Sequence, residues 1–179
     1  MLEELLRKNR SAILNKWFND VIATYPGDSG KFLGGEKDRF NNPVGNTIKD
    51  QSSILFDALI GDSPANRVDE AIENIMKIRS VQDFKPSEAV VIVFLLKTAI
   101  EETLKSEIKR QNLENELIDF HKNIDGLALS FFNSYTSCRE IINRIRINEM
   151  KNRNKLLQKR MNVFNDTSMQ EGDSDNDSA

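Results

Sequence analysis

Few side chains in this sequence have the chemistry of a catalytic or ligating group. The 179-residue chain contains one histidine, His121, and one cysteine, Cys138. His121 is the side chain whose ordinary pKa lies near neutrality, so proton transfer or haem ligation would fall to it. Its place beside Leu117 and Ile124, at the edge of an apolar helix face, favours a partly buried, hydrogen-bonded histidine instead. One thiol and one imidazole provide neither an internal disulfide nor the four ligands of structural zinc, so we predict no metal site.

Two short motifs resemble parts of enzyme sites. Gly27-Asp28-Ser29-Gly30 matches the tetrapeptide around a chymotrypsin-type nucleophile, and Gly30-Lys31 weakly resembles a phosphate-binding loop. Neither has the required context, because His121 lies in a helical pattern and Phe32 stands where a phosphate loop needs Ser or Thr. The carboxylates are scattered over helix surfaces without a neighbouring base. We therefore predict a turn at 27–30, no catalytic residue, no cofactor and no enzymatic activity.

The spacing of apolar residues predicts an all-α fold. With 39% hydrophobic and 30% charged residues, the chain fits one globular domain with polar extensions. Apolar residues recur at steps of three and four, which places them on one face of each helix. We expect about five helices, covering residues 2–22, 44–60, 64–79, 86–110 and 113–160.

The fourth predicted helix has the most apolar stretch of the chain. Ala89–Leu96 is a run of eight apolar residues, far short of the ~20 that cross a bilayer, so we predict the centre of the core there. Met1–Arg10 mixes acidic and apolar residues, unlike a secretory signal. We expect a cytoplasmic protein without a transmembrane segment.

The last predicted helix has no obvious end, because residues 127–160 contain neither Pro nor Gly. We expect it to leave the globule near Arg139 as a long projecting helix. Residues 139–160 carry eight basic side chains against two acidic ones. This helix could bind nucleic acid or an anionic membrane, but it lacks interleaved aromatics and adjoins an acidic tail. We favour a coiled-coil or connector helix.

Apolar residues form a thin stripe on that helix. Ile142, Ile145 and Leu156 are the predicted contacts with another chain, although Glu149 and Asn152 make the heptad pattern imperfect. Residues 161–179 hold five acids and no base, which predicts disorder. The expected organisation is a helical domain at 1–138, a basic helix at 139–162 and a disordered tail at 163–179.

Two local strings carry a family resemblance. Phe40–Gly45 (FNNPVG) and Arg79–Val90 (RSVQDFKPSEAV) resemble the signature stretches of the RsbRD-type N-terminal sensor domain, which belongs to stressosome co-antagonist proteins. Further matches, over about residues 2–150, lie at Trp17, Tyr25-Pro26, Leu96-Lys97, Ile124-Asp125, Tyr135 and Arg139-Glu140.

The resemblance implies a non-catalytic, all-α sensory or interaction module. Related domains resemble globins without haem and pair as homodimers, so the fold is expected to be globin-like or an orthogonal bundle. In those relatives a helix leads from the dimer into a STAS domain. We expect only a disordered tail after Arg160 and no STAS domain, so the phosphoswitch of that domain does not carry over.

The signature strings also have a physical interpretation. Asn42-Pro43 fixes an extended turn, and Gly45 permits a close approach or a positive φ at the start of a helix. Polar residues mark the second string, in the connector before the central helix. Residues 26–44 are predicted to form a loop, and the connector could pack on it. The polar groups would then either hold the two segments together by hydrogen bonds or line a ligand pocket. We favour the first interpretation, because buried polar side chains most often satisfy backbone groups. The residues singled out as a structural or interaction motif are Asn42, Pro43, Gly45, Arg79, Gln82, Asp83 and Pro86.

Taken together, we predict a sensory or adaptor domain in signal transduction, a homodimer with an unidentified protein partner. The dimer would use the outer faces of the first and last helices. Two alternatives stay open: a haem or small-ligand sensor with His121 as ligand, and an anion- or nucleic-acid-binding protein that uses the basic helix, nucleic acid being the less favoured partner.

Overall fold

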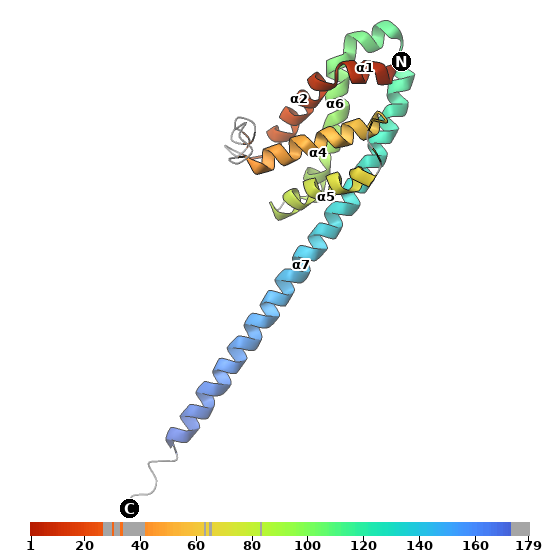
Figure 1. The fold of residues 1–179 in the computed structure, drawn as a ribbon. Helices are drawn as coiled ribbons and strands as arrows, with labels where there is room; N and C mark the ends of the chain where they lie inside the picture. Colours follow the sequence, from red (N-terminus) through yellow and green to blue (C-terminus); the bar gives the residue numbers. More distant parts are fainter. Residues whose placement is uncertain are drawn as a thin grey trace, which may run out of the picture. The chain divides into compact units, whose positions relative to one another are not determined.

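The all-α fold is confirmed. The computed structural model describes residues 1–26, 30, 33, 42–62, 64, 66–82 and 84–172, with side chains described as far as residue 162. These residues form six α-helices and no strand (Figure 1). The chain divides into two units, Met1–Arg139 and Glu140–Ala179. The helices are α1 (Leu2–Lys8), α2 (Arg10–Ala23), α4 (Pro43–Leu59), α5 (Asn66–Val81), α6 (Pro86–Gln111) and α7 (Glu114–Gly172).

The first predicted helix is in fact two helices. Asn9 separates α1 from α2 with φ −103° and ψ 13°, outside the helical range. The side-chain amide Nδ2 of Asn9 donates to the carbonyl of Leu5 at 2.9 Å, which caps the end of α1. The prediction of a single helix over 2–22 was therefore wrong.

Two helices begin with a proline in the first turn. Pro43 starts α4 and Pro86 starts α6, at positions where a helix needs no backbone donor. The Glu88 carboxylate reaches back and accepts from the Lys85 backbone N–H at 2.9 Å, which satisfies a donor next to the first turn of α6.

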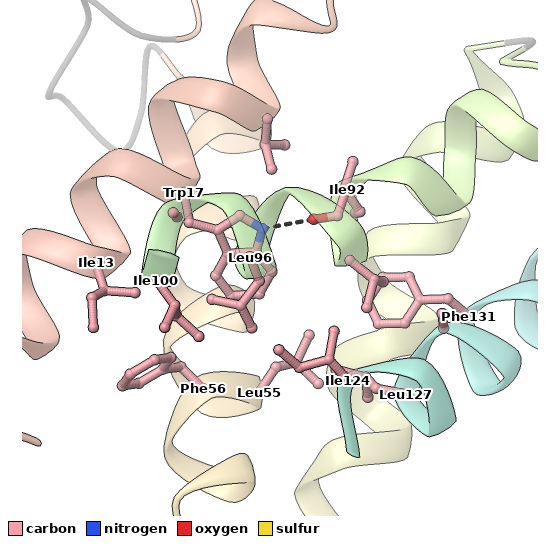
Figure 2. Close-up of a cluster of buried hydrophobic side chains, with 14 of the residues drawn as sticks. Ile13, Trp17, Leu55, Phe56, Ile92, Leu96, Ile100, Ile124, Leu127 and Phe131 are labelled. Atoms are coloured by element: carbon pink, nitrogen blue, oxygen red, sulfur yellow. Dashed lines mark hydrogen bonds between the residues drawn. The ribbon is translucent and has the colours of Figure 1, made fainter. Parts of the chain in front are cut away.

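The core of the first unit is built around α6. Figure 2 shows Ile92, Leu96 and Ile100 of α6 among apolar side chains from α2, α4 and α7. The indole Nε1 of Trp17, a fully buried side chain, donates to the Ile92 carbonyl at 2.7 Å. The predicted position of the core is correct, but Phe94 is 43% exposed, so neighbours do not enclose α6 on every side.

Helices α6 and α7 run antiparallel in the first unit. Asn112 makes the turn between them with φ 53°, a left-handed conformation that asparagine tolerates better than most residues. Lys97 Nζ lies 2.6 Å from Asp125 Oδ1, and His121 Nδ1 lies 3.6 Å from Glu101 Oε1. Residue 97 of α6 thus pairs with residue 125 of α7, and residue 101 with residue 121, as expected for antiparallel helices.

Helix α7 is longer than the sequence analysis expected. It continues to Gly172, past the boundary at 162 that the charge pattern suggested. In the part of the chain that the structure describes, no helix combines the length and the apolar character needed to cross a bilayer.

A buried arginine junction as the candidate functional site

Arg79 is the most unusual buried side chain of the first unit. It lies in the last turn of α5 and is fully buried, although arginine is rarely buried without compensating partners. Its Nη2 donates to Thr24 Oγ1 at 3.1 Å, at the end of α2, and to the Glu88 carbonyl at 2.8 Å, in the first turn of α6. One guanidinium thus joins the ends of three helices.

Two aromatic rings flank this guanidinium. The Cζ atom of Arg79 lies 4.0 Å from the centroid of the Phe84 ring and 5.2 Å from that of Tyr25. The rings meet edge to face, with centroids 5.2 Å apart and an interplanar angle of 82°. The negative faces of aromatic rings attract a cation most strongly when water is excluded, as it is here.

The junction holds a buried cation that the Glu88 carboxylate attracts but that forms no direct ion pair with a described carboxylate. Among the described residues, Arg79 forms no ion pair, its Nε and Nη1 have no acceptor, and the Tyr25 hydroxyl has no hydrogen-bond partner. Burial lowers the pKa of Arg79, and attraction to Tyr25 and to the Glu88 carboxylate opposes that shift. Burial also raises the pKa of Tyr25, and the nearby Arg79 cation acts in the opposite direction by lowering it. Because an arginine stays protonated in proteins, the junction has to accommodate a full positive charge.

Helix α7 is attached to the same junction. The Tyr135 hydroxyl donates to the carbonyl of Phe84, and Arg139 Nη1 donates to the carbonyl of Ser80 at 3.0 Å. Both acceptors lie in the 79–90 string. This string therefore contacts the end of α2 through Arg79 and α7 through its backbone carbonyls.

The other signature string builds a tight turn at the start of α4. Asn42 is buried; its Nδ2 donates to the Leu33 carbonyl at 2.7 Å and its Oδ1 accepts from the Gly45 N–H at 2.9 Å. A Cβ atom on Gly45 would lie 2.5 Å from Asn42 Nδ2 and 2.7 Å from the Leu33 oxygen, which is too close for any other residue. The close approach of Asn42 and the Leu33 carbonyl to the Gly45 backbone explains why this position is a glycine.

The structure separates the other predicted motif residues. Gln82 and Pro86 are exposed, and Asp83 lies outside the described residues, as do residues 27–29 of the Gly-Asp-Ser-Gly motif. Tyr25 and Phe84 were named only within the strings that carry the family resemblance, and neither was predicted to be a partner of Arg79. Their positions in the matched strings were the only signal that could have identified them.

The three residues predicted as a helix interface lie in the second unit. Ile142 is partly buried, and Ile145 and Leu156 are about half exposed.

His121 and Cys138 lie elsewhere in the first unit. Burial lowers the pKa of His121 and Lys97 adds to that shift, whereas Glu101 and Asp125 oppose it. His121 Nε2 is buried, with no hydrogen-bond partner among the described residues. Cys138 is buried as a free thiol, and burial raises its pKa, so it has little thiolate character.

The grooves of the described surface gather no catalytic set. A groove of about 410 Å³ lies between the end of α6 and the start of α7, and its lining is formed by Glu101, Glu102, Lys105, Ile108, Lys109, Glu114 and Leu117. A second groove, of about 250 Å³, is lined by α4, α5 and α7 and holds the polar side chains of Asn123 and Ser130. Within the described ranges, no group of three or more His, Cys, Asp or Glu side chains could hold a metal ion.

A family model matches this chain over most of its length. The family model described as the RsbT co-antagonist protein rsbRD N-terminal domain matches residues 11–150 of this chain. No curated protein and no solved structure matches this chain. The matched range contains every residue of the Arg79 junction.

Removing the hydroxyl that connects α7 to the junction should weaken the fold measurably. Tyr135→Phe keeps the ring but leaves the partly buried Phe84 carbonyl without its donor, which costs about 1–2 kcal/mol of unfolding free energy. Urea denaturation followed by circular dichroism measures this loss. Ser137→Ala, on the exposed side of the same helix, should change stability by less than about 0.5 kcal/mol. Equal stabilities of the Tyr135→Phe variant and the wild type would contradict the contact.

The stability of the chain should fall as the pH falls below neutrality, because the pKa of His121 in the folded protein lies below its ordinary value of 6.5. The unfolded chain then binds the proton first, so stability is lost from about pH 7 downward toward the lowered pKa. His121→Gln should reduce this slope. The comparison is thermal unfolding of both proteins from pH 7.5 to 5.5. His121 is the chain's one histidine, so parallel curves would show that its folded pKa is not lowered.

Proposed function

Because the chain belongs to the RsbT co-antagonist protein rsbRD N-terminal domain family, we propose that it is a cytoplasmic, non-catalytic sensory and adaptor domain that dimerises and docks a partner through α7. The family is one of signalling domains. The observation that carries the proposal is the exposure of α7 in the second unit. There Ile147, Met150 and Met161 are among the large apolar side chains that are at least half exposed. A cluster of exposed apolar side chains is typical of an interaction surface.

We place the dimer contact in the first unit, on the face shared by α6 and α7. Leu129 is 70% exposed and Phe132 is 50% exposed, one turn and two turns after Asp125 on α7. Phe94 precedes Lys97 by one turn on the antiparallel α6, so it extends the same face. The exposed residues of α1 and α2 are polar, charged or alanine, which leaves the last helices as the stronger candidates for the dimer.

The signal would travel from the junction to α7. A change at Arg79 that shifts α5 against α6 would move the carbonyls of Ser80 and Phe84, and these hold Arg139 and Tyr135. These contacts support a relay because both ends of each bond lie in one packed unit and both acceptors follow Arg79 in the same string. The junction thus serves as the connection between the sensory body and α7.

Charge introduced on the proposed dimer face should dissociate the dimer. Phe132→Glu buries a carboxylate in each copy of the contact, so we expect light scattering to show a dimer for the wild type and a monomer for the variant. Asn133→Glu adds the same charge at the next residue, about 100° around the helix, and should remain dimeric. A wild-type monomer, or identical masses for both variants, would refute this dimer face.

A further inference from the structure

The second unit contains a helix whose apolar side chains fall on more than one face. Between residues 141 and 161, seven large apolar side chains are at least half exposed: Ile141, Ile145, Ile147, Met150, Leu156, Leu157 and Met161. An isolated helix gains nothing from exposed apolar area, since such area stabilises only when it is buried. The spacing of these residues indicates what could cover them.

Five positions form a regular stripe. Ile147, Met150, Asn154, Leu157 and Met161 follow one another at alternating steps of three and four, the a and d positions of a heptad repeat. At 100° per residue they fall within an arc of about 80°. Leu156, next to Leu157, lies on the other side of the helix, as does Ile145. We call the five positions the heptad stripe.

Asn154 occupies the central a position of the heptad stripe. Asparagine at an a position fixes the register of a two-stranded coiled coil, because it pairs with an asparagine of the other helix at some cost in stability. Its neighbours in the stripe are suited to close packing, with an Ile at one a position and a Leu at one d position. The stripe is therefore compatible with a single partner helix in a defined register.

The flanks of the heptad stripe carry charge of one sign. The e and g positions hold five basic side chains, one glutamine and no acid: Arg144, Arg146, Lys151, Arg153, Gln158 and Arg160. Residues 144–162 contain seven basic side chains and one acidic side chain, Glu149, which gives a net charge of +6. In a parallel pair of identical helices, e and g positions meet across the contact, so a second copy would bring like charges together.

We propose that the heptad stripe binds an acidic amphipathic helix of another protein. The fitting partner has apolar residues at a and d, an asparagine opposite Asn154, and Glu or Asp at its e and g positions. Complementary flanks favour this pairing over self-pairing by replacing repulsion with attraction at the same positions. The inference rests on the proposed docking through α7 and identifies the chemistry of the partner.

The test uses the full chain and synthetic peptides of four heptads with Ile at a, Leu at d and one Asn at a central a position. One peptide has Glu at all e and g positions, and its counterpart has Lys there. By titration calorimetry, the acidic peptide should bind one to one and at least about tenfold more tightly than the basic one, with the difference shrinking at high salt. Equal binding of the two peptides, or no binding of either, would overturn the proposal.

Adjacent leucines provide a matched pair of variants. Leu157→Ala removes a d residue of the heptad stripe and should weaken acidic-peptide binding at least about tenfold, whereas Leu156→Ala removes the same side chain from the other face and should leave it unchanged. Circular dichroism confirms that both variants remain helical. Equal losses in both variants would overturn the assignment of the stripe.

Three further outcomes identify other occupants or separate the two proposals. Self-association that Leu157→Ala abolishes would make the occupant a second copy and overturn the proposal. A DNA duplex that binds wild type and Leu157→Ala equally, while the acidic peptide does not bind, would indicate phosphate binding and also overturn it. The Phe132→Glu variant, tested with the same peptides, should become monomeric and still bind the acidic peptide. Its mass thus tests the dimer face independently of the partner.

Discussion

A buried positive charge that cannot be neutralised constrains the first unit. The Arg79 guanidinium needs acceptors and aromatic faces, and these come from the end of α2, the start of α6 and the connector before it. Because burial of the cation is tolerated only while these partners stay in place, an intact Arg79 holds the ends of these helices together. The 79–90 string supplies the buried charge and its partners Phe84 and Glu88, and it presents two backbone carbonyls to α7.

The apolar side chains of α7 are buried in the first unit and exposed in the second. Before Arg139 the helix buries Ile124, Phe131 and Tyr135 in the core of the first unit. After Glu140 it is a helix with exposed apolar residues and a strong positive charge. A helix of this second type gains stability when its apolar side chains are covered, since most helical stability in proteins comes from packing of an apolar face. The proposed function follows from this difference along one element.

The sequence predicted helices more accurately than contacts. Apolar spacing and the prolines at 43 and 86 located the starts of α4 and α6 closely, because these signals are local. The break at Asn9 was missed because the apolar pattern continues across it without Pro or Gly. Arg79 was singled out as polar, but its burial depends on Thr24, 55 residues away, which no local pattern reveals. The heptad stripe was not predicted from the sequence, because the predicted contacts, Ile142, Ile145 and Leu156, lie on another face of the helix.

The central claim is that the Arg79 junction and α7 respond together. Hydrogen–deuterium exchange of the full chain, compared between wild type and Arg79→Lys, tests it most directly, with the exposed Lys77→Arg as the control substitution. The lysine variant keeps the charge but loses the planar guanidinium that bridges two acceptors and stacks on Phe84. The account predicts faster exchange both at 79–90 and at 131–139 of α7, with the core turns of α6 around Leu96 to Leu104 unchanged. Faster exchange confined to α5, with 131–139 as protected as in the wild type, would contradict it.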